Sequence, residues 1–139
     1  MPNNVLNIAA ACLLDDAGRL LVVRKLGSHI FMLPGGKVEI GETPLQTLRR
    51  ELQEELSLIT EESQLQLLGH FQALAANEPD HWVKADVFVG RLAEKVQAQA
   101  EIEALDWLTP QTPHRIRLAP LLRQQVIPAL LQRLGSEEY

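Results

Sequence analysis

The sequence is poor in cysteine, and this scarcity narrows the class of protein. Cys12 is the only cysteine among 139 residues. An intramolecular disulfide framework is therefore excluded, and a reducing compartment is expected. Because Cys12 lies within an apolar run, we expect it to act as a small core residue.

Basic residues are also in the minority. The chain has 13 lysines and arginines against 18 aspartates and glutamates, which gives a formal net charge of −5. Proteins that bind DNA or RNA usually present a basic surface to the phosphates, so no nucleic-acid partner is expected. An acidic protein that handles phosphates would instead need a metal ion between itself and its substrate.

Long hydrophobic runs are missing as well. No stretch approaches the ~18 apolar residues that a membrane span requires. The first apolar run ends at Asp15, and no basic segment precedes it as in a signal peptide. With 46% apolar and 22% charged residues, the composition is that of a globular protein. We therefore expect one domain over residues 1–139, cytoplasmic and without a membrane partner.

Several segments have the pattern of strands. Apolar residues 5–14 and 20–24 flank a turn signal at 15–18, which predicts a β-hairpin. A short apolar segment at 30–33 leads into Pro34-Gly35-Gly36, where a loop should begin and extend through Gly41. Further strands are predicted at 65–75, 81–92 and 102–108, with a turn at 76–80 between the first two.

Two segments have the pattern of helices. Thr43 is suited to the N-cap, Pro44 to the first helical position and Gln46 to a capping box, so a helix should run from about 44 to 56. Its apolar face is one stripe of leucines at 45, 48, 52 and 56. A second helix should begin at Pro120 and be kinked by Pro128. The order of elements predicts one mixed sheet with helices on its faces.

The first helix carries an acidic edge. At about 100° per residue, Glu51, Glu54 and Glu55 fall within an arc of about 100° beside the leucine stripe. Neighbouring like charges cost about 0.2–0.5 kcal/mol per pair, and only Arg50 offers partial relief. Two interpretations remain open on spacing alone. The edge is either a solvated acidic face, or a site for a hard divalent cation such as Mg²⁺, which oxygen ligands bind.

The residues around this edge resemble a known family. Gly36, Glu42, the run Arg50-Glu51-Leu52-Gln53-Glu54-Glu55 and Ser57-Leu58 have the spacing of the Nudix box, the signature of hydrolases that act on nucleoside diphosphates linked to another group. The preceding FMLPGG, with Phe31, is also similar. Ser57 stands where the family normally has glycine. Because glycine supplies a left-handed helix C-cap, we expect a different helix exit here.

The resemblance implies a fold, a reaction and a cofactor. The fold would be α+β, a three-layer α/β/α sandwich around a central mixed sheet. The reaction would be attack of water on phosphorus with Mg²⁺, which Mn²⁺ could replace, on an NTP, dNTP or ADP-ribose-like substrate. The alternative is a Nudix-like domain that senses a nucleotide without cleaving it. Many members form homodimers, although nothing in this sequence requires it.

The resemblance also implies roles for individual residues. Glu54 and Glu55 would be the main metal ligands, Glu51 would share a second metal, and Arg50 would hold the glutamates by a charge-assisted hydrogen bond. Glu101 is a candidate ligand or general base, or a solvated glutamate at a strand edge. Glu103 is its rival for that role. Glu42 is expected to anchor the loop.

Substrate contacts are predicted from the loop and its neighbours. Gly35 and Gly36 would offer backbone N–H groups to phosphates, and Arg24 and Lys37 could contact the same phosphates or be ordinary surface cations. Phe31 could stack on a base or pack in the core. Base recognition is expected to depend on loops.

Overall fold

The computed structural model describes residues 4–75, 80–92, 95–112 and 115–137. Its strands are β1 (Val5–Leu14), β2 (Leu20–Lys25), β3 (Phe31–Met32), β4 (Gly35–Lys37), β5 (Gln66–Leu74), β6 (Trp82–Arg91) and β7 (Ile102–Leu108). Its helices are α1 (Pro44–Leu56), a short 3₁₀ turn (Glu62–Gln64), a π-helical turn (Leu122–Val126) and α2 (Ile127–Glu137). The turn predicted at 76–80 falls mostly outside the described residues.

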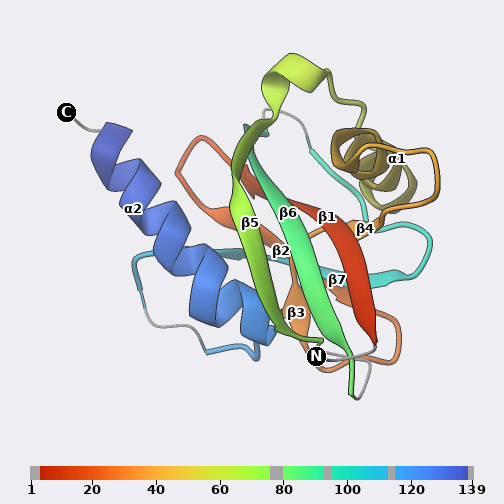
Figure 1. Ribbon diagram of the computed structural model, residues 1–139. Helices are drawn as coiled ribbons and strands as arrows, with labels where there is room; N and C mark the ends of the chain where they lie inside the picture. The colour runs from red at the N-terminus through yellow and green to blue at the C-terminus, as the bar shows by residue number, and fades with distance from the viewer. Residues whose placement is uncertain (1–3, 76–79, 93–94, 113–114, 138–139) are drawn as a thin grey trace.

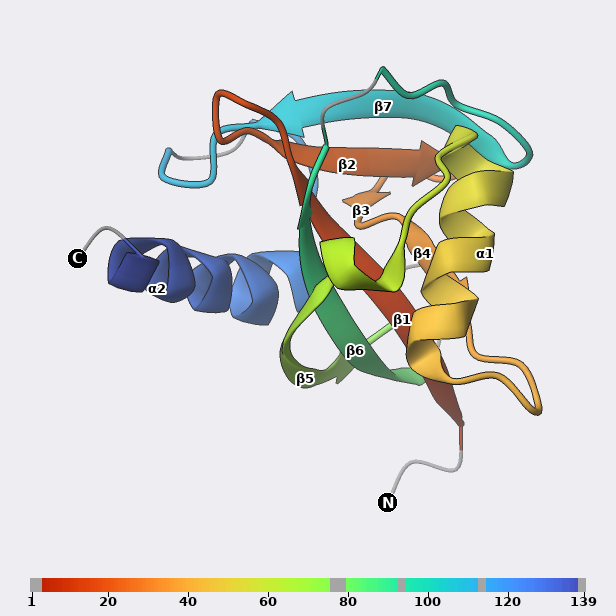
Figure 2. The ribbon, with the colours of Figure 1, turned by 90° about the horizontal axis from the view of Figure 1, so that it is seen from above.

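The strands form one mixed sheet between two helices. The strand order is β3-β2-β1-β6-β5, with β4 paired to β1 and β7 paired to β2. The β1–β6 pair is parallel, and the other pairs are antiparallel. Helix α1 lies on one side of the sheet and α2 on the other, as Figures 1 and 2 show. This arrangement confirms the predicted α+β fold with helices on both faces.

Strand β1 supplies side chains to both hydrophobic layers. Ala9, Ala11 and Leu13 pack in the cluster that contains the buried leucines of α1. The alternate residues, including Cys12, pack in the cluster that contains Leu122 and Leu130 on the other face. Cys12 is fully buried, which raises the pKa of its thiol to about 12 and confirms it as a core residue.

The predicted hairpin of the first two strands is correct only at its turn. The Gly18 N–H donates to the Asp15 carbonyl at 2.9 Å, but β1 and β2 share only the Leu14–Leu20 pair. Most of β1 pairs with β6 in parallel from Val5–Trp82 to Leu14–Arg91. The partner is distant in the sequence, so no local turn signal could indicate it.

The loop predicted from Gly35 onward was wrong for its first residues. Gly35, Gly36 and Lys37 form β4 and pair with Ala10, Ala9 and Ile8 of β1. A Cβ at Gly35 would lie 2.1 Å from the Ala9 carbonyl oxygen, and the φ of Gly35 is +152°. Only glycine can therefore bring the backbone so close to β1 at this point.

Helix α1 begins as predicted, but the conformation of its C-cap residue differs from the prediction. The Thr43 side chain accepts from the Gln46 N–H, and the Gln46 side chain accepts from the Thr43 N–H, which completes the capping box. At the other end, Ser57 has φ 54° and ψ 32°. The expected change of helix exit is therefore wrong, because Ser57 adopts the left-handed C-cap that glycine favours.

The C-terminal helical segment differs from the predicted kinked helix. The Ile127 N–H donates to the Leu122 carbonyl five residues earlier, which closes a π-helical turn. Pro128 follows at once and has no N–H to continue the ordinary pattern of hydrogen bonds.

Residues in this region also contact β5, the last strand on its side of the sheet. The Gln125 side chain bonds the N–H and the carbonyl of Gln72, and Arg133 donates to the Leu67 carbonyl at 2.9 Å.

Within the described residues, no helix is both long and apolar enough to cross a membrane.

Candidate functional site

The three glutamates of the acidic edge lie in different environments. Glu55 points inward and is 2% exposed, whereas the Glu54 side chain is 55% exposed. The Glu55 carboxylate accepts a hydrogen bond from the Gly35 N–H at 3.1 Å. Burial raises the pKa of Glu55 to about 7, although the Gly35 hydrogen bond opposes that rise. A shared arc on the helix therefore does not give the three carboxylates equal exposure.

Glu51 is held against the glycines of β4. A Cβ at Gly36 would lie 2.4 Å from the Glu51 carboxyl carbon, so the Glu51 side chain occupies the space that glycine leaves. Burial raises the pKa of Glu51, and the hydrogen bond from Arg50 opposes this shift. Gly35 and Gly36 thus position two different glutamates, one through its backbone N–H and one by the absence of a side chain.

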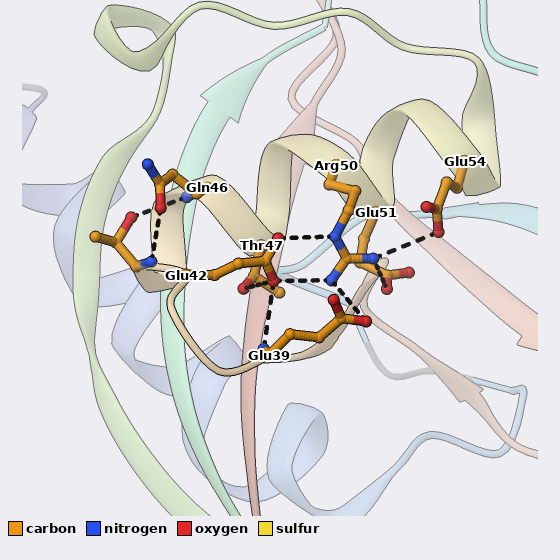
Figure 3. A network of polar contacts seen from close by, with 8 residues as sticks. Glu39, Glu42, Gln46, Thr47, Arg50, Glu51 and Glu54 are labelled. Atoms are coloured by element: carbon orange, nitrogen blue, oxygen red, sulfur yellow. Dashed lines mark hydrogen bonds and ion pairs between the residues drawn. The ribbon is translucent and has the colours of Figure 1, made fainter.

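Arg50 lies at the centre of the acidic residues, as Figure 3 shows. Its Nε and Nη2 donate to the two oxygens of Glu42 at 2.9 and 3.0 Å. Its Nη1 donates to Glu51 at 2.9 Å and lies 3.5 Å from Glu54. Nη2 also lies 3.7 Å from Glu39. One guanidinium therefore neutralises much of the acidic edge, and these partners raise the pKa of Arg50.

Glu42 anchors the loop to α1. Besides Arg50, the Thr47 hydroxyl donates to its carboxylate at 2.8 Å and the Glu39 N–H donates at 3.3 Å. The Arg50 hydrogen bonds, followed by the one from Thr47, lower the pKa of Glu42 to about 2. Because the Glu42 oxygens are committed to these donors, Glu42 is a support for the loop and helix rather than a free acceptor.

The donor set suits a hard divalent cation. Within the described part of the chain, no three His, Cys, Asp or Glu side chains are close enough to hold a metal ion in their present positions. The reason is that Arg50 lies between Glu51 and Glu54, while Glu55 turns towards Gly35. All three nevertheless offer only carboxylate oxygens, which Mg²⁺ and Mn²⁺ accept. A cation would also offset the cost of ionising the buried Glu55.

A cavity of about 560 Å³ adjoins this acidic edge. Its charged rim consists of Lys25, Lys37, Glu39, Glu51 and Glu101, together with the backbone of Gly35 and Gly36. The Lys25 ammonium lies 3.7 Å from Glu101, and Lys25 acts electrostatically on both Glu51 and Glu55. A cavity of this size with charged groups in its lining can hold a small anionic molecule.

Lys25 is a site residue that the sequence did not reveal. It follows Arg24 at the end of β2, where neighbouring side chains point to opposite faces. The first four residues of β2, Leu20 to Val23, are all buried, so their pattern does not indicate which face belongs to the site. Arg24 and Lys37 were each predicted either to contact phosphates or to be ordinary surface cations. The structure places Lys37 and Lys25 in the cavity lining, and not Arg24.

The structure also separates other predicted residues from the cavity. Arg24 donates to the Ser28 carbonyl at 3.0 Å, lies 3.4 Å from Glu103, and stacks over Phe31 at 5.7 Å from the ring centre. Phe31 packs against the hydrophobic cluster on the α2 side. Neither Arg24 nor Phe31 lines the cavity, and Glu103 faces Arg24. Of the two rival glutamates, Glu101 is therefore the one that lines the cavity together with Glu51.

Comparison with known proteins identifies the family. The NUDIX domain model matches residues 5–130, which include the acidic edge and all seven strands of the sheet. The chain belongs to the Nudix family.

Individual relatives match over shorter stretches. The chain is 33% identical over 69 residues to an 8-oxo-dGTP diphosphatase of Haemophilus influenzae, covering 47% of this chain and 51% of the relative. It is 40% identical over 53 residues to an RNA pyrophosphohydrolase of Acinetobacter baylyi, covering 38% of this chain and 32% of the relative. The matched regions thus span about half of the first relative and about a third of the second.

Solved structures extend the likeness to the whole fold. The E. coli ORF135 protein superposes with a TM-score of 0.75 at 24% identity, covering 96% of this chain and 93% of that one. At this level of identity the match supports the fold alone. It agrees with the Nudix arrangement of sheet and helices.

Proposed function

We propose that this chain is a divalent-metal-dependent pyrophosphohydrolase that acts on a nucleoside diphosphate linked to another moiety. The observation that carries the proposal is the position of Glu51 and the buried Glu55, held by Gly36 and Gly35 beside a cavity with a charged rim. The related diphosphatase and pyrophosphohydrolase act on phosphoric anhydrides by name. We extend the proposal to NTP, dNTP and ADP-ribose-like substrates, because all contain the anhydride that the glutamates beside the cavity would act on.

Each residue of the site has a proposed role. Glu54 and Glu55 would be the principal ligands of Mg²⁺, or of Mn²⁺ in its place, with Glu51 and Glu101 able to join them. When bound, the metal would polarise the phosphoryl oxygens and favour attack by water. Lys25 and Lys37 would hold the substrate phosphates, while Gly35 and Gly36 would keep Glu55 and Glu51 in position.

Arg50 would act through the glutamates. Its bonds to Glu42 fix its position, and its contacts with Glu51 and Glu54 set the directions of both carboxylates. Glu101, beside Lys25, is the candidate for holding the proton of the attacking water. A cytoplasmic protein that acts on small nucleotides and not on nucleic acid completes the proposal, and a homodimer is compatible with it.

The test is the Glu54→Gln variant. Purified wild-type protein with Mg²⁺ should release a nucleoside monophosphate from NTP or NDP-linked substrates. Glu54→Gln should reduce kcat by at least about a hundredfold because it removes a charged metal ligand. Glu54 is largely exposed, so the melting temperature should be nearly unchanged.

Glu62→Gln is the matched control. Glu62 is a comparably exposed glutamate whose contact is a 3.9 Å ion pair with Arg49, away from the cavity. This variant should keep full activity. Unchanged turnover in Glu54→Gln would refute the proposed roles. A nucleotide that raises the melting temperature but is recovered intact after incubation with Mg²⁺ and Mn²⁺ would favour the non-cleaving sensor instead.

A further inference from the structure

The C-terminal helical segment is regular except at one turn. Upstream of that turn, the Arg123 N–H donates to the Ala119 carbonyl at 3.0 Å, which is the four-residue spacing of an α-helix. Downstream lies α2, which is also α-helical. Between them the Ile127 N–H donates to the Leu122 carbonyl, five residues back instead of four. This π-helical turn therefore contains one residue more than an α turn.

The extra residue decides which side chains face the sheet. Leu121 and Leu130 are nine residues apart in the sequence, which at about 100° per residue would place them about 180° apart on a regular α-helix. Both are nevertheless buried, at 8% and 0% exposure, in the hydrophobic cluster of the same face. One inserted residue reduces their separation by about 100°, to about 80°, and so brings both onto one face. The joint burial of Leu121 and Leu130 thus depends on the π-helical turn.

The upstream end of the segment belongs to the cavity beside the acidic edge. Leu121 and Leu122 both line this cavity. At the other end, Arg133 joins α2 to β5 through the Leu67 carbonyl. With α2 fixed in this way, loss of the extra residue would rotate the upstream end by about 100° and carry Leu121 out of the cavity wall. The shape of the wall therefore depends on the hydrogen bonding of a turn that follows it in the chain.

Pro128 is the residue that excludes a regular α-helix at this turn. It has no N–H to donate to the Gln124 carbonyl, and in an α-helix its ring would collide with that carbonyl. Pro128 itself is exposed and is not among the residues that line the cavity. We propose that Pro128 is a positioning residue, which maintains the π-helical turn and thereby keeps Leu121 in the cavity wall. The inference rests on the proposed function, which makes this cavity the substrate site.

The test is the Pro128→Ala variant. Alanine supplies the missing N–H and is the best helix former, so the Ile127 N–H should bond the Arg123 carbonyl in an α turn. Crystal structures of wild type and variant should show this change, with Leu121 outside the cavity wall in the variant. KM for a nucleotide substrate should rise about tenfold with kcat nearly unchanged, because an apolar contact is lost and the glutamates of α1 are not. The melting temperature should change little, since the better helix former offsets the exposure of Leu121.

Deletion of Gln124 from the Pro128→Ala variant provides the rescue. Gln124 is exposed, and its removal brings Leu121 and Leu130 one residue closer, so that a regular α-helix places them about 80° apart. KM should then return to nearly the wild-type value, which a general loss of stability would not allow. Arg123→Ala is the control, because it removes an exposed side chain from the same turn without changing a backbone hydrogen bond. This control should keep the wild-type KM.

Two results would overturn the inference. The first is a Pro128→Ala structure in which the Ile127 N–H still bonds the Leu122 carbonyl, because packing alone would then hold the turn. The second is an unchanged KM in a variant whose Leu121 has left the cavity wall. A wild-type protein that cleaves no nucleotide would instead refute the hydrolase proposal alone, since the crystal structures still show whether Pro128 sets the position of Leu121.

Discussion

Arg50 and Glu42 form a two-pronged pair: Nε and Nη2 of the arginine donate to the two carboxylate oxygens at 2.9 and 3.0 Å. Glu42 belongs to the loop before α1, and Arg50 lies within the helix, so the pair ties the two together. The same guanidinium reaches Glu51 and Glu54. The geometry of the acidic edge consequently depends on a residue of the preceding loop.

Replacing Arg50 with lysine should disturb both the loop and the edge. Lysine keeps the positive charge but loses the planar fork that matches a carboxylate. We expect Arg50→Lys to lower the melting temperature and to reduce kcat more than it raises KM. Circular dichroism melts and initial rates measure the two effects. Arg49→Lys is the control, because Arg49 makes one hydrogen bond, to the Thr60 carbonyl at 2.8 Å, which an ammonium group can replace.

The Glu42 carboxylate should make stability depend on pH in the acid range. Its pKa is lowered from 4.5 to about 2, first by Arg50. A lowered folded-state pKa stabilises the protein fully above about 4.5, and this contribution is lost as the pH falls towards 2. The difference in melting temperature between wild type and Glu42→Gln should therefore shrink over this window. A difference that stays constant with pH would contradict the pairing.

Alanine at Gly36 should mainly reduce activity, whereas alanine at Gly35 should mainly reduce stability. A Cβ at Gly36 meets the mobile end of Glu51, so Gly36→Ala should displace that carboxylate and lower kcat/KM by about a hundredfold, with little effect on the melting temperature. A Cβ at Gly35 meets the backbone of Ala9 and Ala10, so Gly35→Ala should cost about 3 kcal/mol of unfolding free energy. Activity assays and thermal melts distinguish the two. An equal loss of stability in both variants would contradict the separate roles given to the two glycines.

Added Mg²⁺ should stabilise the wild-type protein through Glu55. A ligand at 100 times its Kd contributes about 2.7 kcal/mol to the folded state. Glu55→Gln keeps the size and the acceptor for the Gly35 N–H but loses the negative charge, so Mg²⁺ should raise its melting temperature much less. Glu62→Gln should respond to Mg²⁺ as the wild type does. A full shift in Glu55→Gln would exclude this carboxylate as a ligand.

The sequence predicts α1 well because its signals are local. The capping box at Thr43 and the leucine stripe each involve residues within a few positions of one another, and both are present in the structure. Ser57 shows the limit of this reasoning. Its left-handed conformation is imposed by the Schellman-type bonds of Ser57 and Leu58 to the end of the helix, which outweigh the intrinsic preference of serine.

Features that depend on distant partners could not be predicted. The parallel pairing of β1 with β6, and the pairing of Gly35 and Gly36 with β1, are set by tertiary packing. In the site, too, local features could be predicted and features set by distant residues could not. The acidic edge follows from helical periodicity, but the burial of Glu55 depends on Gly35, and the choice of Lys25 over Arg24 depends on how β2 meets β7, where the register shifts between those two residues.

The contacts of Gln125 and Arg133 with β5 bear on how the protein behaves at high concentration. A strand at the end of a sheet offers unpaired N–H and carbonyl groups to any other chain, and such edges promote aggregation. Here Gln125 occupies both backbone groups of Gln72, and Arg133 occupies the Leu67 carbonyl. Side chains of the C-terminal helical segment thus cover three backbone groups of β5 that a strand of a second molecule could otherwise bond.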